Sequence, residues 1–148
     1  MFRIEYDILN IDIGASEVNK DSLRYSLFLG SAFFKDGTNE IIMDWDWIPP
    51  LDFAFSLQQI NKRLAQTAEI RMEFEFTESD AKLIFKKNRN VIEISTTFSD
   101  CVLTVDKHEF ATEVNRIYKQ IVAEIIISNK EIMNNKDFFR YMNESGEG

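Results

Sequence analysis

The stretch MDWDWIPPLDFAF, residues 43–55, is where the sequence changes from the two-residue period of a strand to the period of a helix. Side chains alternate between the two faces of a strand. One face of a strand over residues 40–48 is apolar, with Ile41, Met43, Trp45 and Trp47. The other face is mainly acidic, with Glu40, Ile42, Asp44 and Asp46. We therefore expect the two tryptophans to pack into the core and the two aspartates to face solvent.

Two prolines separate this strand from a helix. Pro49 and Pro50 cannot continue a central strand, but proline fits the first turn of a helix. Apolar residues then recur at helical spacing, at Leu51, Phe53, Ala54, Leu57, Ile60 and Leu64. This pattern predicts an amphipathic helix that starts near residue 50.

Working outward, the alternation of apolar and polar residues predicts further strands. They cover residues 2–13, 23–34, 69–77, 81–87, 91–98 and 101–105, with a loop over 14–22. The strand over 23–34 is apolar on both faces, which indicates a central, covered position. Asp36-Gly37 is a hairpin signal between this strand and the next. Alternation in EIRMEFEFT turns Ile70, Met72, Phe74 and Phe76 inward.

A second long helix is predicted near the C-terminus. Asp106 is suited to cap its start, and Glu109 stands at the spacing of a capping box. The apolar stripe of this helix consists of Phe110, Val114, Ile117, Tyr118, Ile121 and Ile125. A short helix is also predicted around residues 137–142, followed by a polar, frayed tail from about residue 143.

The order of these elements predicts an α+β fold. Three strands, a helix, four strands and a long helix follow one another, and short turns between consecutive strands favour antiparallel pairing. We expect one mainly antiparallel sheet of about six to seven strands, with two principal helices, one after the third strand and one at the C-terminus. Residues 1–148 are expected to form a single domain, with Phe74, Phe76, Ile117 and Ile121 buried.

The overall charge restricts the classes of partner. The chain has 17 basic and 25 acidic residues, and its formal net charge is -8. This charge disfavours nucleic acids and anionic membranes and favours a basic protein partner. No stretch reaches the roughly 18 apolar residues of a membrane span. The acidic residues Glu5 and Asp7 stand where a signal peptide needs an apolar run, so a cytoplasmic location is expected.

Catalytic motifs are weak in this sequence. The single cysteine, Cys101, excludes an intramolecular disulfide and a cysteine-based zinc site, and nothing around it or His108 has the signature of a thiol enzyme. Asp44 and Asp46 could hold a metal ion or share acid–base work, but the sequence contains no motif for a nucleophile or a phosphate loop. We therefore expect no cofactor, no metal and no catalytic residue, and the aspartates are solvated carboxylates in the simplest interpretation.

A binding surface is the remaining interpretation of the acidic strands. Five carboxylates on outward faces with few lysines are the candidate partner-binding residues, namely Glu40, Asp44, Asp46, Glu73 and Glu75. Such a face would attract a basic protein, whereas the alternative is an ordinary solvated surface. If the tryptophans are not in the core, they would instead be anchors for a partner.

The layout resembles small bacterial domains of the immunity proteins of polymorphic toxin and contact-dependent growth inhibition systems. The resemblance covers about residues 22–127 and rests on Ile48, Pro49, Leu51, Phe53, Ala54, Asp106, Glu109 and Phe110. It implies a cytoplasmic protein that neutralises a cognate toxin by direct binding. Two alternatives stay open: an enzyme of unknown type that uses Asp44 and Asp46, and a structural or regulatory subunit of unknown oligomeric state.

Overall fold

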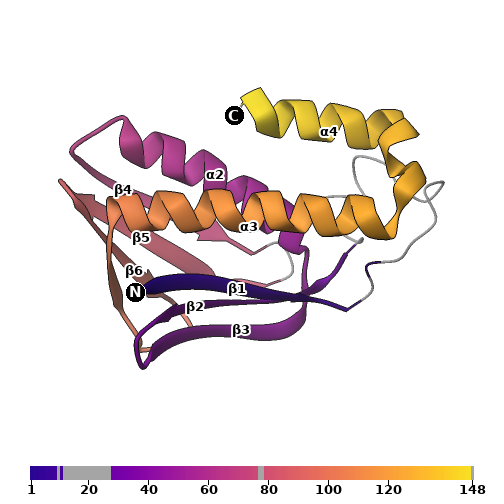
Figure 1. Cartoon of the computed structure of the whole chain (residues 1–148). Helices are drawn as coiled ribbons and strands as arrows, with labels where there is room; N and C mark the ends of the chain where they lie inside the picture. The colour runs from indigo at the N-terminus through magenta and orange to yellow at the C-terminus, as the bar shows by residue number, and fades with distance from the viewer. Residues whose placement is uncertain (10, 12–27, 77–78, 148) are drawn as a thin grey trace.

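The computed structural model describes residues 1–9, 11, 28–76 and 79–147, and it confirms the α+β class (Figure 1). Within these residues, seven antiparallel strands form two sheets. Sheet A contains β1 (Phe2–Ile8), β2 (Gly30–Asp36) and β3 (Asn39–Ile48) in that order. Sheet B contains β4 (Glu69–Glu75), β5 (Lys82–Asn88), β6 (Val91–Thr96) and β7 (Leu103–Asp106). The prediction of a single sheet is therefore wrong, although the number of strands is right.

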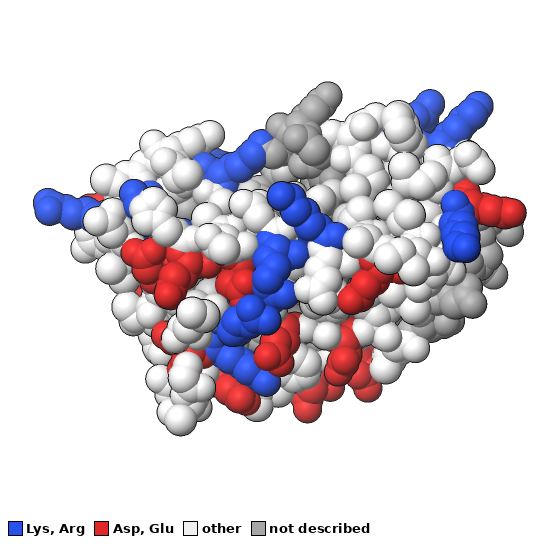
Figure 2. Space-filling model, in the orientation of Figure 1, with Lys and Arg blue, Asp and Glu red and all other residues white. Residues whose placement is uncertain are grey.

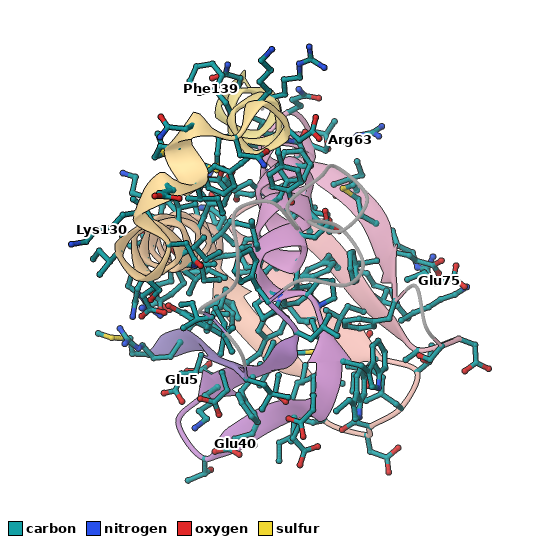
Figure 3. The ribbon with its side chains drawn as sticks, turned by 90° about the vertical axis from the view of Figure 1, so that its right-hand side faces the viewer. Glu5, Glu40, Arg63, Glu75, Lys130 and Phe139 are labelled. Atoms are coloured by element: carbon teal, nitrogen blue, oxygen red, sulfur yellow. The ribbon has the colours of Figure 1, made fainter. Side chains whose placement is uncertain are left out.

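The division into two sheets follows from the connection between β3 and β4. The chain leaves β3 through the two prolines into helix α2 (Pro50–Ala65), and β4 starts a new sheet instead of pairing with β3. In the side view, sheet A lies below the helices and sheet B lies beside them (Figure 3). Alternation along a strand tells which face is buried, but it carries no information about which strand lies next to it.

The second strand starts later than the sequence predicts. Phe28 has a left-handed backbone, with φ of 56°, which is incompatible with a continuous strand. The strand begins at Gly30, where a Cβ atom would lie 1.7 Å from the carbonyl oxygen of Asp7. Only glycine permits this close approach to β1. Most of the predicted loop and the predicted strand residues 12–13 and 23–27 lie outside the described residues.

The hairpin signal at Asp36-Gly37 is confirmed. Asp36 pairs with Asn39, so Gly37 and Thr38 form a two-residue turn between β2 and β3. Gly37 has a φ of 62°, which places the positive φ at the first central position of the turn. β2 is the central strand of sheet A, as its apolar character predicts.

Both long helices begin where the sequence predicts. Pro50 is the first residue of α2, and the Asp106 carboxylate accepts hydrogen bonds from the backbone N–H groups of His108 and Glu109 at the start of α3 (Lys107–Ser128). All predicted stripe residues of the two helices are buried. A 3-10 helix, η2 (Lys130–Asn134), and a third helix, α4 (Lys136–Glu147), follow, and α4 contains the predicted short helix over 137–142.

The two sheets and the helices share one aromatic core. The Phe53 ring of α2 stacks on Phe34 of β2 at 6.0 Å and on Phe76, just after β4, at 5.8 Å. Phe76, Ile117 and Ile121 are buried, as expected. Phe74 is only half-buried, contrary to the prediction, because β4 is an edge strand of sheet B and the core covers its inner face incompletely.

Candidate functional site

The outer face of sheet A is an open sheet surface with an apolar centre. The register brings Phe33 of β2 beside Ile42 of β3 and opposite Glu5 of β1. Ile42 is 47% exposed, and Phe33 is half-buried. Lys35 lies next to Glu40 in the following row of the same face. A small apolar centre with a charged rim is the usual composition of a protein interface.

The charges on this face are mixed. Lys35 Nζ lies 3.0 Å from the Glu5 carboxylate and 3.9 Å from that of Glu40, and its hydrogen bond to Glu5 raises its pKa. Asp44 is exposed and forms no ion pair with a described residue. Figure 2 shows basic and acidic side chains interleaved over α3 and the strands of sheet A. Glu40 is therefore partly neutralised, whereas no described residue forms an ion pair with Asp44.

Asp46 has a structural role that its neighbour Asp44 lacks. The register shifts between Gly30 and Ala32, which leaves Ser31 opposite residues 44–47 of β3. Asp46 has a φ of 64° in this irregularity. The buried Ser31 hydroxyl donates to Asp46 Oδ1 at 3.0 Å and accepts from the Asp46 N–H at 3.1 Å. Asp46 is exposed as predicted, but these bonds tie its carboxylate and its N–H to the Ser31 hydroxyl of β2.

The two tryptophans lie at the joint between the sheets. Their rings stack with centroids 5.1 Å apart and planes inclined by 11°. The residue between them, Asp46, has a left-handed backbone. Trp45 meets the edges of Phe76 and Phe98. Both indoles pack against the core but are only partly buried, so the prediction that they pack into the core is confirmed in part.

The remaining two candidate carboxylates lie on another surface. Glu73 and Glu75 face outward from β4 in sheet B, where Glu73 pairs with Arg71 at 2.9 Å and with Lys82 at 3.7 Å. Figure 3 shows Glu75 and Glu40 at well-separated places on the molecule. The five predicted residues therefore form two groups, and Glu40, Asp44 and Asp46 stay together on β3.

A buried ionic group joins β1 to α3, and sequence reasoning missed it. The Glu113 carboxylate accepts from the Ile4 N–H at 3.2 Å, and Arg116 Nη2 donates to the Ile4 carbonyl oxygen at 2.6 Å. Arg116 Nε also donates to Glu113 at 2.6 Å. These bonds satisfy the outward backbone groups of Ile4 on the edge strand β1. The sequence spacing could have indicated the buried position of Glu113. This residue follows Phe110 by three positions and therefore lies on the apolar stripe of α3.

A polar hollow of about 500 Å³ lies beside this group, between β1 and α3. Tyr6, Gln120 and Glu124 are among its lining residues. Burial raises the pKa of the Tyr6 hydroxyl, and the negative charge of the nearby Glu124 carboxylate raises it further. The tyrosine therefore stays neutral, and its buried hydroxyl has no hydrogen-bond partner among the described residues.

The other catalytic candidates are not brought together. β7 lies between Cys101 and His108, and four residues of extended chain separate them by about 10 Å or more. Within the described ranges, no group of three or more histidine, cysteine, aspartate or glutamate side chains is arranged to hold a metal ion. Among the described helices, none has the length and apolar character needed to cross a membrane.

Comparison with known protein families, curated proteins and solved structures finds no match to this chain.

Proposed function

We propose that this chain is a non-catalytic protein-binding module, an immunity protein that neutralises a cognate bacterial toxin by direct binding in the cytoplasm. The observation that carries the proposal is the outer face of sheet A. There the exposed Ile42 lies between Glu40 and Asp44, and Glu5 completes the acidic rim. No described element packs over this face in the side view (Figure 3).

The charge pattern supports a basic toxin domain as the partner. The net charge of -8 would steer a cationic protein toward the chain, and rim carboxylates act mainly on the rate of association and on orientation. Ile42 would supply the apolar contact at the centre. Glu73 and Glu75 lie on β4 of sheet B, and Figure 3 shows Glu75 well apart from Glu40, so we assign them no part in this contact.

The enzyme alternative receives less support from the same strand. An acid–base pair needs two carboxylates that are free to accept and release protons at a substrate. Asp46 is instead engaged by the Ser31 hydroxyl in the bulge of β3. A subunit role without a toxin stays open as the second alternative, and it would use the same face for a different partner.

The test is charge reversal on β3, combined with a toxin partner. The double variant Glu40→Lys/Asp44→Lys is expected to bind the toxin-like protein encoded immediately upstream about tenfold more weakly at low salt, and the loss should shrink at high salt. Affinity is measured by titration calorimetry, and protection is measured as survival of cells that express the toxin. Asp46 is left unchanged because its replacement would disturb the bulge.

The matched control is Glu93→Lys, which reverses an exposed carboxylate on β6 of sheet B. It should bind like the unmodified protein. If the double variant and the control bind equally at both salt concentrations, the β3 carboxylates are solvated side chains that take no part in binding. A chain that neither binds nor neutralises any upstream product would remove the immunity proposal itself.

A further inference from the structure

β3 is a free edge of sheet A. The strand order is β1-β2-β3, and among the described strands none pairs with the outer side of β3. In Figure 1, β3 forms the lower margin of the molecule. At the opposite edge, β1, Glu113 and Arg116 of α3 bond the N–H and the carbonyl of Ile4. An open edge presents unpaired backbone donors and acceptors to other chains.

The hydrogen bonds of Ile4 determine which backbone groups of β3 point outward. Because both groups of Ile4 point to α3, Ile4 and its partner Phe34 form a non-hydrogen-bonded pair, and the groups of Phe34 point to β3. Phe34 therefore exchanges its bonds with Ile41. The N–H and C=O groups of the residues on either side, Glu40 and Ile42, and of Asp44 beyond, point to the free edge.

The same three residues also turn their side chains to the outer face. Glu40, Ile42 and Asp44 are all exposed. One short segment of β3 thus offers backbone hydrogen bonds from its edge together with a repeating acidic, apolar, acidic pattern from its face. An added strand would meet both at once, because cross-strand neighbours on one face lie about 5 Å apart.

We infer that the partner binds by adding an extended strand to the edge of β3, and this inference rests on the proposed protein-binding function. Backbone bonds to Glu40, Ile42 and Asp44 would hold the added strand, and side chains would select it. The segment that fits has an apolar residue opposite Ile42 and a lysine or arginine opposite each carboxylate. The pairing ends at the bulge, because the left-handed Asp46 turns the strand away.

A second copy of this chain fits the edge less well. Antiparallel pairing of two β3 strands about Ile42 would place Glu40 of one copy opposite Asp44 of the other. Like charges directly opposed across strands are destabilising. Lys35 relieves only part of this repulsion, since it lies 3.0 Å from Glu5 and 3.9 Å from Glu40. The charge pattern therefore favours a basic partner strand over self-association.

Proline at residue 42 tests the edge directly. Ile42→Pro removes an N–H that points away from β2, and proline is tolerated on an edge strand at such positions. Ile42→Ala is the matched control, because it also loses the isoleucine side chain but keeps the N–H. We expect Ile42→Pro to bind the upstream toxin at least about tenfold more weakly than Ile42→Ala, the factor that corresponds to loss of one backbone bond and misalignment of its neighbours.

The outcomes separate this inference from the proposed function. Equal binding by Ile42→Pro and Ile42→Ala, with weakened binding by Glu40→Lys/Asp44→Lys, would overturn strand addition and leave a side-chain interface on the same face. Normal binding by all three variants would overturn both proposals: the outer face of sheet A as the binding surface, and strand addition at the edge of β3. A dimer of the unmodified chain that Ile42→Pro abolishes would show that the edge is occupied by a second copy.

A measurement on the unmodified protein covers the case in which Ile42→Pro fails to fold. The probe is a synthetic heptapeptide with lysine, valine and lysine at alternate positions and threonine elsewhere, and its control has glutamates in place of the lysines. Amide exchange followed by NMR should slow at Glu40, Ile42 and Asp44 with the lysine peptide and not with the glutamate peptide. Unchanged exchange at all three amides under saturating lysine peptide, or equal slowing with both peptides, would contradict the inference.

Discussion

At the residue scale, Lys87 and Glu113 are charged side chains that lie in the interior, where a surface position is the usual expectation. Lys87 is 7% exposed, and its Nζ donates to the carbonyl oxygens of Leu64 at 2.6 Å and Thr67 at 2.8 Å. It therefore caps the C-terminal end of α2, where a cation also meets the negative end of the helix dipole. Lys87 shares the inward face of β5 with Leu83 and Phe85, although the sequence analysis did not assign it there.

Replacing Lys87 should destabilise the fold without touching the outer face of sheet A. Lys87→Met keeps most of the apolar stem but leaves two carbonyls at the end of α2 without their donor. We expect a loss of about 2–3 kcal/mol in the free energy of unfolding, measured by urea denaturation. The control Lys86→Met changes the exposed neighbour and should stay within about 0.5 kcal/mol. Equal stability of the two variants would mean that the capping bonds contribute nothing.

At the element scale, the helices were predictable because their signals are local. The change of period at Pro49, the Asp106 cap and the apolar stripes all act within a few residues along the chain. The start of β2 was not predictable, since it depends on the left-handed Phe28 and on the distance between Gly30 and Asp7 of β1. The bulge of β3 similarly depends on Ser31, a residue of another strand.

Replacing a buried residue of the apolar stripe of α3 measures how much the packing of this helix contributes to stability. Ile121→Ala should lower the free energy of unfolding by about 2–5 kcal/mol, because it opens a cavity under a side chain that is 1% exposed. The control is Ile127→Ala on the same helix, where the side chain is 72% exposed and the change should be below about 0.5 kcal/mol. A small effect at residue 121, with the helix intact by circular dichroism, would contradict the packing of α3.

At the scale of the whole molecule, the sequence predicts the class and the strand count but not the partition into two sheets. Alternation also indicated that Glu40 and Asp44 face solvent, and the structure agrees. It could not indicate that Glu75 lies on a different surface or that β3 has a free edge, because both depend on which strands are neighbours. The candidate site was therefore predictable as a set of exposed residues and not as a surface.

The last prediction concerns the contact between the two sheets. Trp45 and Trp47 are the only two tryptophans of the chain, and Trp45 packs against Phe76 and Phe98 of the sheet B side. Since both sheets also share the rings around Phe53, they should unfold together. Tryptophan fluorescence reports on the joint, whereas far-ultraviolet circular dichroism reports mainly on the helices. The urea midpoints from the two probes are expected to coincide, as in a two-state transition. A fluorescence midpoint at clearly lower urea than the circular dichroism midpoint would contradict this prediction. It would mean that the contact between the two sheets opens before the helices unfold.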